Sequence, residues 1–143
     1  MALRPRFIAM VAVAATMCAS LAYLRDPPWL LTLTSGMRRW ETDADGRRFR
    51  WMGGHASLFV PSDARGVTIP LRTTFAAGEA PVTATISLDD RPVDRIVLDD
   101  PQSHSSIVRL PAKSARRVRR IDIRVNTTRD DNRGAAVGEI TIK

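Results

Sequence analysis

Two histidines, with the serines and acids near them, are the residues whose types could do chemistry in this sequence. His104 lies in the run Gln102–Ser106, where a serine beside a histidine would suggest a nucleophile and its general base. The only other histidine is His55, and the sequence has no Gly-x-Ser-x-Gly elbow. A polar loop accounts for the same residues. We therefore predict that the protein is not an enzyme.

Adjacent acidic residues occur as the pairs Asp89-Asp90, Asp99-Asp100 and Asp130-Asp131. Paired carboxylates can serve glycoside hydrolysis, but each pair stands at an expected turn, where aspartate hydrogen-bonds its own backbone. The run Asp43–Gly46 resembles the start of a calcium loop, yet the further oxygen ligands of such a loop are missing. Two histidines without acidic help also cannot build a common zinc site. We predict neither a metal nor another cofactor.

The charge of the chain is strongly positive, with 22 basic against 15 acidic residues and a net charge of +7. Such a balance fits either an anionic partner or an arginine-rich soluble surface. Acidic residues are interspersed through the same segments, which favours the solvated surface. The most basic stretch, residues 116–126, contains no aromatic residue that could stack on a base. We therefore predict no nucleic-acid partner.

Alternation of apolar and polar residues predicts the elements that must position any site, and it is strongest just after residue 81. Val82, Ile86 and Leu88 share one face of a strand, as two-residue periodicity requires. The turn formers of Asp89–Pro92 follow, so the chain can reverse into a second arm at 93–98. Two strands alone are marginal in water. This hairpin therefore needs a larger sheet around it.

Further short strands are expected, separated by turn-forming residues. They cover residues 29–34, 49–51, 56–60, 67–75, 105–110, 120–125 and 137–142. Expected turns include 35–36, 43–46 and 53–54, within a polar, turn-rich segment from 37 to 48. No segment after Leu24 has a helical period. The sequence thus predicts an all-β fold, an antiparallel β-sandwich of jelly-roll type.

The alternation also assigns faces to the expected strands. The predicted core comprises Val82, Ile86, Leu88, Ile121, Ile123 and Val125. Arg120, Asp122 and Arg124 then form an outward row, in which the central carboxylate partly neutralises its neighbours. Pro70 lacks a backbone donor, which predicts an edge strand or a bulge at that position.

The amino terminus has the features of a membrane-directed segment. The run Phe7–Leu24 is uncharged, follows Arg4 and Arg6, and contains the only cysteine, Cys18. A helix of about 18 residues approaches the hydrocarbon thickness of a bilayer, which favours an uncleaved anchor. Small residues near its end would also permit cleavage of a signal peptide. We expect residues 1–26 to be a signal anchor or signal peptide, and residues 27–143 to be extracytoplasmic.

Short motifs spread over the chain carry a resemblance to a known family. They are Pro28–Leu31, Trp40-Glu41, Gly46–Trp51, Asp131–Gly134 and Val137–Ile140. Together they resemble the β-rich extracytoplasmic domain that follows the last membrane span of some bacterial polytopic glycosyltransferase-like proteins. The 143 residues contain neither the many spans nor a catalytic membrane loop of that family. The resemblance implies a stand-alone sandwich similar to carbohydrate-binding modules, on the periplasmic side of a bacterial inner membrane, without transferase chemistry.

Two function classes follow from these expectations. The first is recognition or positioning of a cell-envelope glycan, for which an exposed aromatic ring with nearby polar groups is the usual site. Trp40 with Glu41, and Asp131 with Arg133, are the candidates, although a loop-packing tryptophan and an Arg-Asp pair of the fold explain the same residues. The second is a structural adaptor that docks onto a polytopic membrane protein through strand edges or through the arginine-bearing face at 120–124.

Overall fold

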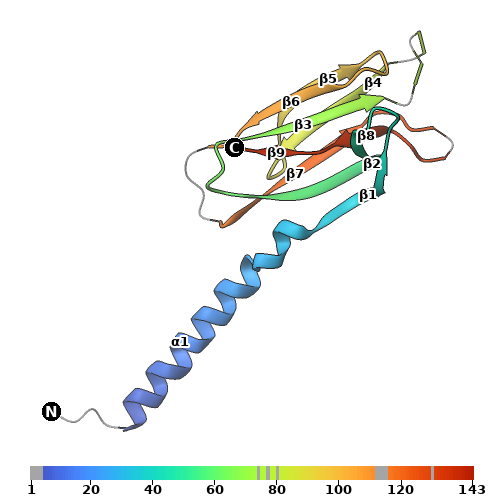
Figure 1. Cartoon of the computed structure of the whole chain (residues 1–143). Coiled ribbons are helices and arrows are strands. Elements are labelled where there is room, and N and C mark those ends of the chain that lie inside the picture. The colour runs from blue at the N-terminus through green and yellow to red at the C-terminus, as the bar shows by residue number, and fades with distance from the viewer. Residues whose placement is uncertain (1–4, 74, 77, 80, 112–115, 130) are drawn as a thin grey trace. The chain divides into compact units, whose positions relative to one another are not determined.

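The computed structural model describes residues 5–73, 75–76, 78–79, 81–111, 116–129 and 131–143, and it divides into two compact units, 1–30 and 31–143 (Figure 1). The first unit contains helix α1 (Pro5–Arg25), in which no side chain is buried. The helix is long and apolar enough to cross a membrane, a test that a signal sequence passes too. It corresponds to the apolar segment found in the sequence.

Nine strands make up the second unit within the described residues. They are β1 (Thr34–Thr42), β2 (Arg48–Pro61), β3 (Gly66–Thr73), β4 (Val82–Leu88), β5 (Arg91–Leu98), β6 (His104–Arg109), β7 (Val118–Val125), β8 (Ala135–Gly138) and β9 (Thr141–Ile142). Their pairings are antiparallel and give the order β5-β4-β7-β2-β8-β3-β6, with β1 beside β2 and β9 beside β3.

The sheet curls so that its two ends meet. Strands β5 and β6 stand at opposite ends of the order yet lie side by side (Figure 1), and Ser106 on β6 donates a hydrogen bond to Asp94 on β5. Apolar side chains fill the space between the two layers, and Ile69, Ile86 and Ile123 are fully buried there. The predicted antiparallel β-sandwich is confirmed.

The hairpin predicted around the Asp89–Pro92 turn is confirmed as β4 and β5. Asp89 and Asp90 have φ values of 48° and 69°, and Leu88 pairs with Arg91 across them. Two central residues with positive φ define the type I′ turn that matches the twist of paired strands. Pro92 already lies in β5, at a register shift on an end strand, where a missing backbone donor is tolerated.

Strand β2 is longer than the sequence predicts, because Gly53-Gly54 lies inside it and makes no turn. Residues 55–61 pair with β7, whereas residues 49–52 pair with β8, so β2 passes from one partner strand to the next at the glycines. A Cβ atom on Gly53 would lie 2.9 Å from the side chain of Asn132. The glycine therefore permits the close approach of the segment that joins β7 to β8, which sequence alone did not reveal.

Strand β1 was missed by the sequence patterns. The predicted strand at 29–34 is largely the 3-10 helix η1 (Pro28–Thr32), in which the fixed φ of proline suits a first helical position. The predicted turn at Gly36 is instead an irregularity within β1, with a φ of 70°. A Cβ atom there would lie 2.0 Å from the backbone oxygen of His55. The expected hairpin loop at Asp43–Gly46 is confirmed, since it connects β1 to β2.

Most predicted core residues are buried. Val82, Ile86, Leu88, Ile121 and Ile123 are at most 4% exposed, and Val125 is partly buried against the same core. The predicted strand at 137–142 is two short strands, β8 and β9. The edge strand or bulge expected at Pro70 is wrong, because β3 lies between β8 and β6 and Pro70 pairs in regular register with Ser105. The missing donor is tolerated because Pro70 falls between the residues of β3 that pair with β8 and those that pair with β9. Thr74, at the end of the predicted strand 67–75, lies outside the described residues.

Candidate functional site

Trp40 and Glu41 lie on opposite faces of β1. Trp40 pairs with Arg50 and Glu41 pairs with Phe49, and consecutive residues of a strand point to opposite sides. The guanidinium groups of Arg48 and Arg50 lie over the Trp40 ring, 4.8 Å and 4.4 Å from its centroid. The ring therefore stacks against two cations, and Glu41 cannot share its face.

Arg50 is the less neutralised of these two cations. Its Nη1 donates a 2.9 Å hydrogen bond to the hydroxyl of Thr34. Burial and the positive charge of Arg48 lower the pKa of Arg50. Arg48 itself reaches Glu139 at 3.4 Å, in a pair whose two side chains are more than half exposed. Within the part of the chain that the structure describes, Arg50 contacts no carboxylate.

A concave region surrounds this aromatic and arginine cluster. The smaller part, here the Trp40 hollow, has a volume of about 340 Å³ and is lined by Met37, Trp40, Arg50, Val137, Gly138, Glu139 and Ile140. The larger part, here the large groove, has a volume of about 880 Å³. Gly138 and Glu139 line both, so the two are adjacent. Trp40 is 38% exposed, and part of its ring is therefore accessible in the hollow.

The large groove lies between the turn that joins β1 to β2, strands β3 and β8, and residues 101–103. Arg72 lies 4.2 Å from the centroid of Phe49 and forms a 3.0 Å ion pair with Asp43. The Asp43 carboxylate also accepts backbone hydrogen bonds from Asp45 and Arg47. Burial alone would raise the pKa of Asp43, but the bonds from Arg47 and Arg72 outweigh it and lower that pKa. Turn contacts therefore hold one side of the groove, whose lining combines charged and apolar side chains.

The other sequence candidates gather around a tryptophan that the sequence did not single out. Trp51 donates from Nε1 to Glu41 at 3.2 Å, and the Arg133 guanidinium lies 5.1 Å from the Trp51 ring centroid. Arg133 forms a 2.9 Å ion pair with Asp131. Two of the four candidates, Glu41 and Arg133, therefore contact Trp51 and not Trp40, and Asp131 joins them through Arg133. The two-residue alternation of β1 could have separated Trp40 from Glu41 in advance, had β1 been recognised.

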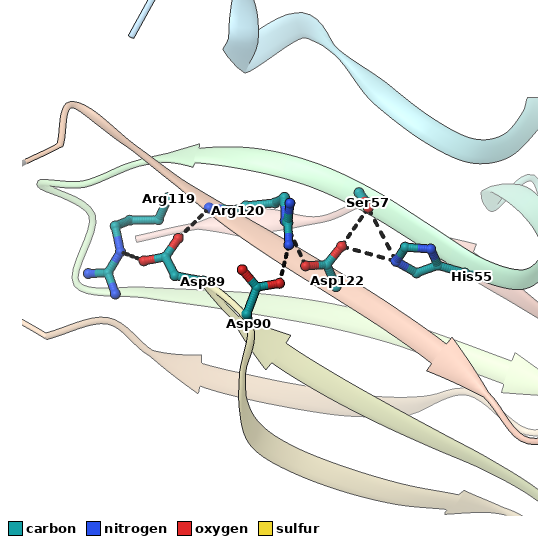
Figure 2. Close-up of polar contacts among 7 residues, drawn as sticks. All are labelled: His55, Ser57, Asp89, Asp90, Arg119, Arg120 and Asp122. Atoms are coloured by element: carbon teal, nitrogen blue, oxygen red, sulfur yellow. Dashed lines mark hydrogen bonds and ion pairs between the residues drawn. The ribbon is translucent and has the colours of Figure 1, made fainter. Parts of the chain in front are cut away.

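A second polar cluster lies on the outward face of β7, around Asp122 (Figure 2). Its side chain is only 6% exposed and accepts from Ser57 Oγ at 2.6 Å and from Arg120 Nε at 2.8 Å. His55 Nε2 lies 3.0 Å from the same carboxylate. Burial would raise the pKa of Asp122, but hydrogen bonds from Ser57, His55 and Arg120 lower it. The predicted outward row is therefore centred on a buried carboxylate and is no open basic face.

The geometry of this cluster differs from a catalytic triad, although a serine, a histidine and an aspartate meet in it. A triad histidine bridges its partners through two different ring nitrogens. Here Nε2 of His55 is the atom near both Asp122 Oδ1 and Ser57 Oγ, and Ser57 donates directly to the carboxylate. The serine proton is thus held by the Asp122 carboxylate, whose lowered pKa makes it a weak base.

The two aspartates of the β4–β5 turn contact the arginines of β7. Asp89 accepts from Arg119 Nε and from the Arg120 backbone N–H, the latter at 2.9 Å, and Asp90 pairs with the Arg120 guanidinium (Figure 2). Arg120 therefore contacts the side chains of Asp90 and Asp122 at once. Arg124, the other arginine of the predicted docking face, is exposed.

A third group of donors stands between β5 and β6. Asp99, Asp100 and His104 each offer a ligand atom, and these atoms lie within 4.8 Å of one another. Local contacts account for the arrangement, since Asp100 Oδ1 accepts from the Gln102 backbone at 2.8 Å and lies 3.0 Å from His104 Nε2. The turn role expected for Asp89-Asp90 is borne out directly, whereas Asp130 lies outside the described residues.

Comparison with known proteins rests on solved structures, since no family model and no curated protein matches this sequence. A family 35 carbohydrate-binding module from an environmental isolate matches with a TM-score of 0.50 at 15% identity, covering 76% of this chain and 86% of that one. The fold is similar to that of a carbohydrate-binding module. At this identity the likeness concerns the fold alone.

Two carbohydrate esterases of family two share this carbohydrate-binding-module-like sandwich. That from Cellvibrio japonicus matches with a TM-score of 0.50 at 15% identity, over 76% of this chain and 30% of the esterase. That from Clostridium thermocellum, in complex with cellohexaose, matches with a TM-score of 0.50 at 7% identity, over 78% and 31%. The chain spans less than a third of either esterase, and the glycosyltransferase-like setting expected from the sequence stays a prediction.

Proposed function

We propose that residues 27–143 form a non-enzymatic module that recognises or positions a glycan of the cell envelope at the Trp40 hollow and the large groove. The observation that carries the proposal is the partly exposed Trp40 ring in a hollow that continues into a groove of about 880 Å³. Sugar sites combine an aromatic face with a few polar groups, and this hollow adds Arg50 and Glu139 to the ring. The fold supports the same proposal.

The proposed setting is a bacterial inner membrane, with α1 as the anchor and the β-domain in the periplasm. Support comes from the apolar helix and from Arg4 and Arg6 before it, because basic flanks stay in the cytoplasm. A reporter that is active only outside the cytoplasm, fused after Lys143, should be active. Activity of a cytoplasm-only reporter at that position would contradict the topology, and loss of about 22 residues on a gel would identify a cleaved signal peptide.

A glycan array tests recognition directly. The full chain in neutral detergent is applied to envelope polysaccharides, together with Trp40→Ala and with Ile107→Ala as the matched control. Ile107 is 68% exposed and lines neither the hollow nor the groove. We expect binding by the wild type and the control, and loss of binding by Trp40→Ala. Absence of binding by the wild type would contradict glycan recognition. Binding that Trp40→Ala leaves unchanged would contradict the Trp40 hollow as its site.

A structural adaptor is the second candidate, and exposed apolar side chains on both end strands favour it. Val93 and Val97 on β5 are 46% and 49% exposed, and Ile107 on β6 is 68% exposed. An adaptor predicts co-purification with a polytopic membrane protein and no glycan binding. Val97→Asp and Arg124→Glu should weaken that co-purification. Arg120 is unsuitable for the test, because reversing its charge would also disturb Asp122.

A further inference from the structure

Positive charge exceeds negative charge around Trp40, in contrast to the Asp122 cluster. Arg48 and Arg50 both lie within 5 Å of the Trp40 centroid, at 4.8 Å and 4.4 Å. The carboxylate that contacts this pair in the described structure is Glu139, 3.4 Å from Arg48, with side chains 61% and 54% exposed. An exposed pair of this kind contributes little stability. Of these two neighbouring cations, Arg48 has one weakly held anion and Arg50 contacts none among the described residues.

Arg50 bears most of this imbalance. Its contacts are the hydroxyl of Thr34 and the face of Trp40, both uncharged, and its nearest charge effect is repulsion by Arg48. A cation–π contact holds a guanidinium in position, but its N–H groups, which lie in the guanidinium plane, still need hydrogen-bond acceptors. Since Arg50 lines the Trp40 hollow, an anion that enters the hollow can approach those donors. Glu139 lines the same hollow, so an anion would meet the guanidinium groups of Arg50 and Arg48 beside one exposed carboxylate that it can displace.

The rest of the hollow specifies more than charge. Met37, Val137 and Ile140 give it an apolar lining beside the exposed part of the Trp40 ring. A free inorganic anion would use none of this surface. A sugar ring presents both an apolar C–H face and, in a uronic acid, a planar carboxylate that a guanidinium fork can bind through two parallel hydrogen bonds. The C–H face of a uronic acid therefore matches the apolar lining and the Trp40 ring, and its carboxylate matches the arginines.

We infer that the ligand of the Trp40 hollow is an acidic glycan, whose uronate carboxylate binds Arg50 and Arg48 while its ring lies against Trp40. The inference rests on the proposed glycan recognition and adds the chemical class of the sugar. The incoming carboxylate takes the place of Glu139 on Arg48. It also relieves the repulsion between the two guanidinium groups, so charge complementarity strengthens binding most at low salt.

The test compares oligosaccharides that differ only in charge. The full chain, held in nanodiscs of zwitterionic lipid, is titrated calorimetrically with a panel of hexuronate oligosaccharides and with the same oligosaccharides after carboxyl reduction. We expect the uronates to bind roughly tenfold or more tightly, the scale of one charge-assisted hydrogen-bonded pair. Arg50→Gln should abolish this preference. Arg50→Lys should keep only part of it, because lysine retains the charge and loses the fork.

Controls separate this site from general electrostatics. Arg95→Gln removes the same charge from an exposed position on β5 that lines neither hollow nor groove, and it should leave the preference intact. Equal binding of charged and reduced sugars would overturn the acidic specificity while leaving glycan recognition standing. Binding of neither would overturn both. Capture by vesicles of anionic lipid, lost in Arg50→Gln and without uronate binding, would reassign the site to the membrane surface.

Discussion

Arg120 and Arg50 are both strand arginines of one sheet, and their surroundings are opposite. Arg120 contacts the carboxylates of Asp122 and Asp90, and the hydrogen bond to Asp122 with the nearby acidic charges raises its pKa (Figure 2). Arg50 has a hydroxyl and an aromatic ring as partners, and burial with the charge of Arg48 lowers its pKa. The Asp122 cluster is therefore internally satisfied, whereas in the Trp40 hollow Arg50 contacts no carboxylate among the described residues and Glu139 pairs only with the exposed Arg48. The first is expected to serve stability and the second binding.

The largest effect should come from the core beneath both regions. Ile123 is fully buried, so Ile123→Asp places an unpaired carboxylate in an apolar site and costs several kcal/mol, roughly the whole stability of many domains. We expect loss of the cooperative unfolding transition by circular dichroism. The control Ile107→Asp, at a position 68% exposed, should unfold like the wild type. A cooperative transition of Ile123→Asp at the wild-type midpoint would contradict the core.

Next should come Gly36→Ala, at the irregularity of β1 that precedes Trp40. Gly36 has a φ of 70° and no room for a Cβ atom beside the His55 carbonyl, so we expect a loss of about 3 kcal/mol in denaturant unfolding. Gly46→Ala is the matched control, because Gly46 has a φ of 78° but open space around it. It should lose about 1 kcal/mol from backbone strain alone. Equal losses would show that the close approach at Gly36 has no energetic weight.

Asp122→Asn should then distinguish the satisfied cluster from the hollow. We expect a loss of about 2 kcal/mol at neutral pH, because charge-assisted hydrogen bonds to Arg120 and His55 are weakened, with glycan binding unchanged. The folded pKa of Asp122 is lowered, so its stabilising effect is complete above the unfolded value of about 4 and disappears as the pH falls through the folded pKa. The stabilities of the wild type and Asp122→Asn should therefore converge on acidification, which denaturant unfolding between pH 7 and pH 2 measures.

The control for that series is Asp63→Asn, at an exposed position, which should leave stability unchanged at every pH. A difference between wild type and Asp122→Asn that stays constant on acidification would exclude ionisation of Asp122 as its cause.

Arg50→Gln should have the smallest effect on stability, within about 0.5 kcal/mol of the wild type, because the lost ring contact is offset by relief of repulsion from Arg48. Arg120→Gln is the sharpest comparison and should cost about 1.5 kcal/mol or more, since it leaves the buried Asp122 with one charged partner fewer. Both are measured by denaturant unfolding at low salt. Equal losses of stability in Arg50→Gln and Arg120→Gln would contradict the contrast between the Trp40 hollow and the Asp122 cluster.

Sequence reasoning recovered the parts of this fold that depend on local pattern. The β4–β5 hairpin followed from alternation and from two aspartates at its turn, and five of the six predicted core residues are at most 4% exposed. It failed where a strand carries polar residues at the sheet edge, as in β1, and where Gly53-Gly54 continues a strand. Glycine permits a turn or a close approach equally well, and only the position of Asn132 decides between them.

The candidate site was predicted in its residues more than in its arrangement. Trp40 does line a hollow, but Glu41 and Arg133 meet Trp51 instead, because β1 places adjacent residues on opposite faces. Arg48 and Arg50 were not predicted as a pair, although their spacing of two residues puts both on one face of β2. That signal was readable once β2 was known to pair with β1.

The sequence by itself determined which residues are strand-forming, which face of each strand is apolar, and that one apolar helix precedes them, because these properties depend on residues a few positions apart. The tertiary structure decided which charge meets which. Ser57 and Asp122 are 65 positions apart, and only the register of β2 against β7 brings them together. The pairing of β1 with β2 likewise places Arg50 beside Trp40, where it contacts no carboxylate among the described residues, because contacts between strands depend on register and not on a local run of residues.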